Sequence, residues 1–227
     1  MNITEKGTLT KQKIIDSAQI LFYDQGYTST TVAQITSKAD VNNGLFTYYF
    51  GSKRNLASMI LNEFRIDFRN LISKKIFDQH IQYNFAVGIA VDHRLNMKLK
   101  AESSNLMRFE NELNRDLHQV DKETLKKLTN PQREHYYQLQ KRLINPNISD
   151  TDLQLHKFLS YEIINALYSA YENEVVHADI EYLTDYYIRL FFHMLQLPPQ
   201  EIELILEESK EITSKIQINT LPYFMLE

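Results

Sequence analysis

The sequence predicts an all-α protein, with a small N-terminal domain of three helices in residues 1–56 and a larger helical domain in residues 57–227. Two observations favour helices throughout. The 227 residues include only five Gly and five Pro, about half of average usage, so positions that break helices are scarce. Apolar residues recur three and four positions apart, as on one face of a helix, rather than alternating as in a strand. At 43% hydrophobic residues, the chain can bury a substantial core.

The first part of the chain is divided into short helical segments by residues that favour turns. A first helix is expected from Lys11 to Gln25, and Gly26 is placed to end it. A second is expected from Thr31 to Lys38 and a third from Asn43 to Tyr49. Ser52 is placed to cap a long fourth helix.

The remainder of the chain is also expected to be helical. Asn130-Pro131 should kink or split one of these helices, and Pro198-Pro199 should separate the last two. The expected helices are Gln79 to His93, Asn105 to His118, Lys122 to Ile144, Asp150 to Glu174, Ile180 to Leu197 and Gln200 to Gln217.

Several classes of function lack the residues that they need. The chain has no Cys, which rules out disulfides and thiolate sites and fits a cytoplasmic location. The seven His residues show no helical metal-site spacing, and no nucleophile elbow, P-loop or dinucleotide fingerprint occurs. The most apolar stretch, Ile180 to Leu197, contains Asp185, Arg189 and His193 and is a poor membrane span. We therefore expect no catalytic residue, no metal, no cofactor and no membrane partner.

The net charge of −4 conceals an asymmetry along the chain. Residues 1–76 contain ten Lys and Arg against six Asp and Glu, whereas residues 77–227 contain fifteen against twenty-three. A basic end on an acidic body allows one end to approach phosphate.

Two short helices joined by a tight turn and packed on a preceding helix form a helix-turn-helix, whose second helix enters the DNA major groove. Asn at the start of that helix can pair with an adenine edge, and a Thr methyl can meet a thymine methyl. Tyr and Lys can reach phosphates, as can the backbone amides that begin the second and fourth helices. The candidate side chains are Asn42, Asn43, Thr47, Tyr48, Tyr49 and Lys53. For the two Asn residues, helix capping is the alternative role.

Three segments resemble the DNA-binding domain of the TetR/AcrR family: TTVAQI at 30–35, ADVNNG at 39–44 and YYFGSKRNL at 48–56. Upstream, IIDSA at 14–18 and the stretch from Leu21 to Tyr27 match the family's first helix. The resemblance covers residues 10 to 60 and implies that Tyr48 and Lys53 contact phosphate. The complete set of expected DNA-binding residues is Thr30, Thr31, Asn42, Asn43, Thr47, Tyr48, Tyr49 and Lys53.

The sequence departs from the family pattern at three positions. Asp40 stands where the family usually has Gly, and we expect the turn to survive because Asp tolerates the left-handed conformation. Asn43 replaces a frequent basic residue, which puts one backbone contact in doubt. Thr47 replaces a common Tyr, which should alter base preference.

The C-terminal half contains two helices that are apolar on more than one face. From Ile180 to Leu197 the polar residues fall four apart on one stripe, so the helix needs burial on two sides. The resemblance implies a homodimer whose last large helices form an intersubunit four-helix bundle; a large monomeric core is the alternative. The expected interface residues are Leu155, Leu159, Ile163, Leu167, Tyr187, Leu190, Phe191 and Met194.

The resemblance also implies a small-molecule pocket in the C-terminal domain, where a bound ligand shifts the fourth helix and moves the DNA-reading heads apart. Aromatic and Met residues on the middle helices are the candidates, and ordinary core packing is the alternative role for each. These candidates are Phe85, Met97, Met107, Phe109, Tyr136, Tyr137 and Tyr161.

Together these features predict a transcriptional regulator that binds double-stranded operator DNA as a homodimer. The expected mode is a repressor released from a palindromic operator by a small-molecule effector. The alternative is a helical protein-interaction module, or co-regulator, that acts through a partner protein.

Overall fold

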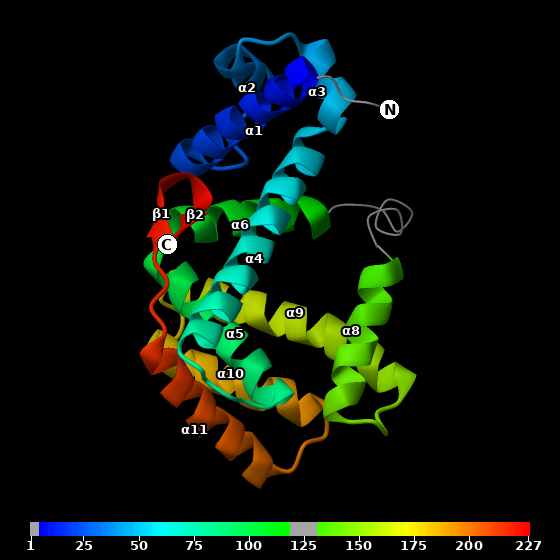
Figure 1. Cartoon of the computed structure of the whole chain (residues 1–227), viewed down its shortest axis with the longest axis vertical. Helices are drawn as coiled ribbons and strands as arrows, with labels where there is room; N and C mark the ends of the chain where they lie inside the picture. The colour runs from blue at the N-terminus through cyan, green and yellow to red at the C-terminus, as the bar shows by residue number, and fades with distance from the viewer. Residues whose placement is uncertain (1–4, 119–130) are drawn as a thin grey trace. The chain divides into compact units, whose positions relative to one another are not determined.

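The computed structural model describes residues 5–118 and 131–227, with side chains described for residues 7–116 and 137–227. These parts of the chain are helices joined by loops, with one small hairpin near the C-terminal end (Figure 1). The helices are α1 (Glu5–Gln25), α2 (Val32–Ala39), α3 (Asn43–Phe50), α4 (Lys53–Asp78), α5 (Phe85–Glu102), α6 (Ser104–His118), α8 (Pro131–Ile144), α9 (Asp150–Glu172), α10 (Ile180–Met194) and α11 (Pro199–Lys215). The all-α expectation is confirmed.

The hairpin was not predicted from the sequence. Strand β1 (Thr220–Leu221) pairs antiparallel with β2 (Met225–Leu226), and the short 3-10 turn η1 (Pro222–Phe224) joins them. Thr220 lies opposite Leu226 and Leu221 opposite Met225. Strands of two residues give too little alternation for a sequence pattern to reveal them.

Contacts divide the described chain into two units, and neither is continuous in sequence. The first comprises residues 5–71, 102–118 and 218–227; the second comprises residues 72–101 and 131–217. This division differs from the single expected boundary after residue 56. The first unit also includes most of α4, the whole of α6 and the C-terminal hairpin.

The expected helix from Gln79 to His93 is wrong in its position. Helix α4 continues to Asp78 and ends where His80 takes the left-handed conformation, with the Ile81 amide donating to the Ile76 carbonyl. Helix α5 then begins at Phe85, because the Asn84 side chain caps it by accepting from the Val87 amide at 2.9 Å.

Proline and capping residues set the later helix starts largely as expected. Helix α8 begins at Pro131, and residues 122–130 of the helix expected from Lys122 to Ile144 lie outside the described part of the chain. Ser149 caps α9 and Asp179 caps α10 through their side chains. Pro199 occupies the first turn of α11.

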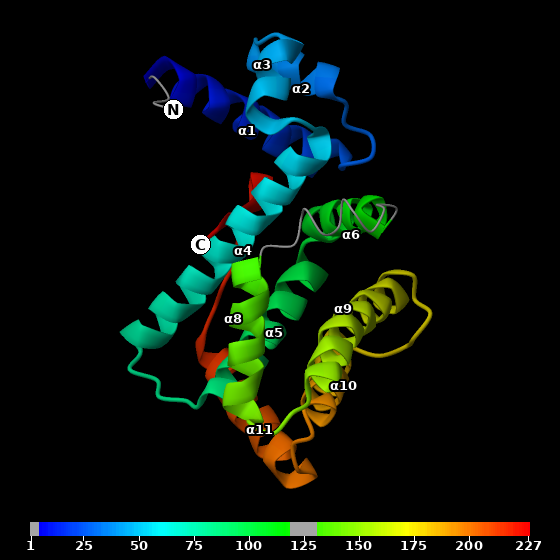
Figure 2. The ribbon, with the colours of Figure 1, turned by 90° about the vertical axis from the view of Figure 1, so that its right-hand side faces the viewer.

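In the second unit, α10 packs against both α9 and α11 (Figure 2). Its side chains Leu183, Ile188 and Phe192 are buried. Asp185, expected on a polar stripe, is also buried, and it lies 2.6 Å from both Arg94 of α5 and Lys210 of α11. This ion cluster ties three helices together. Within the described residues, no helix is both long enough and apolar enough to cross a membrane.

Candidate nucleic-acid interface

Helix α2 begins and ends with well-formed caps. Thr31 and Gln34 form a reciprocal capping box: the Gln34 amide donates to the Thr31 hydroxyl at 3.2 Å, and the Thr31 amide donates to the Gln34 side chain at 2.8 Å. Asp40 ends the helix in the left-handed conformation, with φ of 53°. The expectation that Asp replaces Gly in this turn without destroying it is confirmed.

Helix α3 spans only eight residues and presents a polar leading end. Its apolar anchors Phe46 and Phe50 are buried, whereas Asn43, Thr47 and Tyr48 are exposed. Gly51 ends the helix at a φ of 72°, which favours glycine. A short helix held by buried aromatics and open at its first turns is the form of a major-groove reading helix.

The two Asn residues at the start of α3 already make hydrogen bonds within the motif. Asn42 is the N-cap, and its Oδ1 accepts from the Leu45 amide at 2.9 Å. The Oδ1 of Asn43 accepts from the Thr36 hydroxyl at 2.7 Å. Paired recognition of adenine uses both the oxygen and the nitrogen of an Asn amide. To bind a base edge in this way, either Asn must therefore share or break its hydrogen bond within the motif.

Thr30, which was expected to bind DNA, is instead buried within the fold. Its side chain is only 1% exposed, and its hydroxyl donates to the Gly26 carbonyl at 2.7 Å. Its amide donates to the Tyr27 carbonyl. A residue with both groups engaged inside the fold cannot contact a phosphate. Thr31, Asn42, Asn43, Thr47 and Tyr48 are exposed, while Tyr49 and Lys53 are partly buried.

Lys53 has an internal role that the sequence did not suggest. Its ammonium donates to the carbonyls of Tyr27 at 2.8 Å and Thr30 at 2.7 Å, and lies 4.1 Å from the centre of the Tyr27 ring. Burial lowers the pKa of Lys53, although the charges of Asp116 and Glu112 oppose this. Lys53 thus joins the start of α4 to the loop between α1 and α2.

Three charged side chains of α6, spaced four residues apart, hold the same loop. Arg108 donates to the carbonyls of Tyr23 and Asp24, which are at the end of α1. Glu112 accepts from the Thr28 amide at 2.6 Å. Asp116 accepts from the Tyr27 hydroxyl and from the Arg54 guanidinium. Because i, i+4 and i+8 lie on one helix face, the three form a single contact stripe, which we name the α6 ladder (Arg108, Glu112, Asp116).

Asp116 is the most heavily engaged member of the α6 ladder. It accepts from the Tyr27 hydroxyl at 2.6 Å and from two nitrogens of Arg54 at 2.8 and 3.1 Å. The hydrogen bond from Arg54 lowers the pKa of Asp116. Burial, followed by the hydrogen bond to Asp116, raises the pKa of Tyr27.

Gly26 is required where α1 meets the α6 ladder. Its φ is +86°, and a Cβ there would lie 2.8 Å from a Glu112 carboxylate oxygen. The backbone conformation therefore favours glycine, and a Cβ would also require the Glu112 carboxylate to shift. The ladder was missed in the sequence, although the four-residue spacing of Arg108, Glu112 and Asp116 was readable there.

The structure divides the expected ligand residues between the two units. Met107 and Phe109 lie on α6 in the first unit, where Phe109 stacks between Phe22 and Phe224. Phe109 therefore belongs to the core of the first unit, which favours ordinary core packing as its role. The expected residues of the second unit are Phe85, Met97, Tyr137 and Tyr161; the side chain of Tyr136 lies outside the described residues.

The expected dimer residues are also only partly exposed. Tyr187 and Phe191 are 2% and 3% exposed and belong to the core of the second unit, so they are removed from the interface set. Leu155 and Leu159 of α9 are exposed, and Ile163, Leu167, Leu190 and Met194 are partly exposed. Phe158 of α9 is also exposed, as are Tyr182 and Tyr186 of α10, which continue the stripe of Leu190 and Met194 at four-residue spacing.

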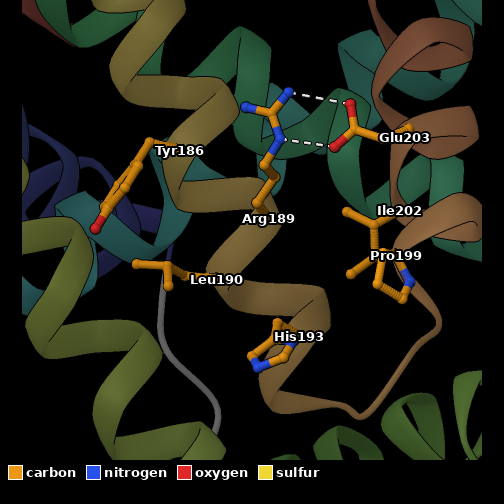
Figure 3. A pocket seen from close by; sticks show the side chains of 7 residues that line it. All are labelled: Tyr186, Arg189, Leu190, His193, Pro199, Ile202 and Glu203. Atoms are coloured by element: carbon orange, nitrogen blue, oxygen red, sulfur yellow. Dashed lines mark hydrogen bonds and ion pairs between the residues drawn. The ribbon is translucent and has the colours of Figure 1, made fainter.

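A groove runs between α10 and α11 beside this stripe (Figure 3). Its volume is 300 Å³, and Tyr186, Leu190 and Ile202 contribute to its lining. Arg189 and Glu203 reach toward each other across the two helices, with nitrogen–oxygen distances of 2.8 and 3.1 Å. The groove is lined mainly by apolar side chains and carries one ion pair.

The first unit therefore combines a helix-turn-helix with a polar and exposed leading end on α3, which defines a DNA-binding domain. Residues 14–59 match the family model described as "Bacterial regulatory proteins, tetR family". Residues 14–59 therefore form an N-terminal domain of the TetR type, and the family that this model describes consists of bacterial regulatory proteins.

Curated proteins match this chain over short stretches. The chain is 44% identical over 55 residues to "Probable HTH-type transcriptional regulator YttP" of Bacillus subtilis, covering 24% of this chain and 27% of that protein. It is 30% identical over 74 residues to "HTH-type transcriptional repressor DhaR" of Mycobacterium sp., covering 33% and 37%. The matched regions thus span about a third or less of these relatives.

Two solved structures share the fold over most of the chain. A TetR regulator from Streptomyces fradiae, TylP, aligns with a TM-score of 0.54 and 16% identity, covering 94% of this chain and all of its own. A TetR-family regulator from Streptomyces coelicolor aligns with a TM-score of 0.51 and 16% identity, covering 87% and all of its own. At this identity the likeness shows the fold alone.

Proposed function

We propose that the protein is a transcriptional regulator that binds operator DNA in the cytoplasm as a homodimer. The observation that carries this proposal is the polar, exposed leading end of α3, held open by its buried aromatic anchors. Thr47 and Asn43 supply groups suited to base edges, and Thr31 and Tyr48 supply groups suited to phosphates.

The homodimer is supported by apolar side chains that α9 and α10 leave exposed. Phe158 is 62% exposed and Tyr182 61%, and Leu155 and Tyr186 are close to half exposed. These residues lie on helices that pack against each other. An apolar surface of this kind on a monomer marks an interface. A two-fold dimer would place two reading helices on a palindromic site.

Selection from a random DNA pool at near-physiological salt tests DNA binding. An enriched palindrome is the expected result. If only salt-sensitive background binding is recovered, the proposal fails and the protein-interaction module becomes the better account.

Single substitutions on α3 test base reading. Asn43→Ala should change which sequence is selected. Thr36→Val is the matched control, because it removes the internal hydrogen bond to Asn43 and leaves the Asn side chain in place. If both variants change the selected sequence in the same way, Asn43 acts through the fold and does not read a base.

The dimer is tested by light scattering of the purified chain. Phe158→Glu should shift the protein toward the monomer, because it places a charge in the apolar face. Leu204→Glu is the control, since Leu204 is also exposed but lies on α11. A wild-type monomer, or equal effects of the two changes, would contradict the proposed interface.

We further propose that the protein acts as a repressor and that a small molecule bound in the second unit releases the operator. The support, besides the family, is a set of polar groups inside an aromatic cluster. His156 donates from Nε2 to the Phe191 carbonyl at 3.1 Å, which leaves Nδ1 to accept the Tyr137 hydroxyl at 2.5 Å. Burial, with the charge of Lys141, lowers the pKa of His156 to about 4, so its ring stays neutral.

A low-molecular-weight cell extract tests this second step. Release of the selected operator by the extract, and weaker release from Tyr137→Phe, are the expected results. An extract that leaves the complex intact at all concentrations would argue against small-molecule control.

A further inference from the structure

The C-terminal segment, residues 218–227, is built into the DNA-binding unit; we name it the C-terminal strap. The strap closes on itself through two hydrogen bonds of 3.1 Å between the backbones of Asn219 and Glu227. Ile218 and Phe224 are buried, and the η1 turn packs against α1 (Figure 1). The chain therefore returns from α11, which belongs to the second unit, to the first unit.

An aromatic column joins the strap to two helices of that unit. The Phe224 ring stacks on Phe109 of α6 with centroids 4.8 Å apart, and Phe109 stacks in turn on Phe22 of α1 at 5.2 Å. Phe224 and Tyr223 both meet Tyr23 of α1 edge-on, at 5.6 and 5.5 Å. Phe224 thus contacts α1 and α6 together.

The strap adopts a backbone that its own residues disfavour. Tyr223 and Phe224 both have φ of 61°, in the left-handed region where turns normally use Gly or Asn. Bulky residues stay in this conformation only where surrounding contacts impose it, and such strain is concentrated at functional positions. Here the imposing contacts are the rings of Tyr23 and Phe109.

The place where the strap binds connects it to the reading helix. Tyr23 lies near the end of α1, and its carbonyl also accepts from Arg108 of the α6 ladder. The end of α1 is therefore held to α6 by two sets of contacts, those of the ladder and those of the strap. Because α1 packs on α2, and α2 packs on α3, a movement of α1 at this junction would also move the reading helix α3.

We infer that the C-terminal strap is a positioning element for DNA binding, with Phe224 as its key residue: it fixes α1 against α6 and so sets the spacing at which a dimer reads two half-sites. The inference rests on the proposed DNA-binding function. A loosened junction lowers the effective concentration of the second head at its half-site without changing any contact to DNA.

The test uses full-length Phe224→Ala, with Met225→Ala as the matched control because Met225 is the neighbouring residue and is 52% exposed. Each protein is titrated with a single half-site duplex and with duplexes carrying two half-sites at varied spacing, chosen from the wild-type selection. Phe224→Ala should bind the single half-site like the wild type. On the best two-site duplex it should lose about tenfold in affinity, and its preference among spacings should broaden. Phe224→Tyr, which keeps the ring, should restore the wild-type spacing profile.

Several outcomes would overturn the inference. Equal loss on the single half-site and on all two-site duplexes would show that Phe224 only stabilises the fold. Unchanged binding on every duplex would show that the strap has no positioning role. If Phe224→Ala does not fold, Phe224→Leu takes its place, and a spacing profile like the wild type's would refute the inference. If the wild type itself selects no DNA sequence, the proposed function fails and the inference fails with it. If the wild type selects a sequence and Phe224→Ala binds every duplex as the wild type does, only the inference fails.

Discussion

Replacing Lys53 by Ala separates two roles that one side chain can hold. The family resemblance implies a phosphate contact, whereas the structure shows the ammonium bonded to the carbonyls of Tyr27 and Thr30. If both roles exist, Lys53→Ala should lower the stability of the DNA-free protein and also weaken DNA binding. Each role has its own measurable quantity.

The stability effect follows from the contacts that are lost. Hydrogen bonds from a charged donor contribute about 1.5–3 kcal/mol each when desolvated, and the partial exposure of Lys53 reduces this. The contact with the Tyr27 ring adds about 0.5–1 kcal/mol. We expect a net loss of about 2 kcal/mol, which lowers the melting temperature of a chain this long by about 4–8 °C.

The DNA effect follows from counterion release. Each phosphate contact contributes about 0.9 to the slope of log affinity against log salt, so a dimer that loses two Lys53 contacts should lose about 1.8. Thermal denaturation without DNA and titrations at several salt concentrations measure the two effects separately. Lys38→Ala, which removes an exposed lysine from the last turn of α2, is the control and should leave the melting temperature unchanged. A Lys53→Ala protein that melts like the wild type would refute the structural role.

Three further predictions concern the α6 ladder and its surroundings. Asp116→Asn should lower the free energy of unfolding by about 1 kcal/mol. Because the pKa of Asp116 is lowered in the folded protein, its carboxylate stabilises the fold above pH 4 and this contribution is lost below it. The variant should therefore lose less stability than the wild type in acid titrations. The raised pKa of Tyr27 means that the wild type should lose stability above pH 10, and Tyr27→Phe should lose less on the same alkaline denaturation curve. Gly26→Ala should destabilise the protein by more than about 1 kcal/mol in denaturant titrations, whereas Gly44→Ala, at a position without positive φ, should have the smaller effect.

The helix-turn-helix was predictable because its determinants are local in sequence. The capping box of Thr31 and Gln34, the cap at Asn42 and the left-handed Gly26 and Gly51 each act within a few residues. Such signals depend on spacing along the chain and do not need knowledge of the tertiary fold. The same reasoning placed the starts of α9 and α11.

Exposure on α10 could not be predicted in the same way. This helix is apolar around most of its circumference, so its sequence pattern does not show which apolar stripe is buried. His93 of α5 packs against both Tyr187 and Phe191, and His156 of α9 packs against Phe191, whereas Tyr182 and Tyr186 are exposed. The buried stripe and the exposed stripe are offset by one residue around the helix. Only the neighbouring helices determine which of the two is buried.

The sequence by itself determined the helical class, the reading motif and its family, because these depend on local propensity and spacing. The tertiary structure alone decided the use of Lys53 inside the fold, the α6 ladder and the C-terminal strap. Asp116 meets Arg54 and Tyr27 across 62 and 89 residues of chain, and Phe224 meets α1 from the other end of the sequence. Contacts over such separations come from how the helices pack together, and no local pattern along the chain encodes them.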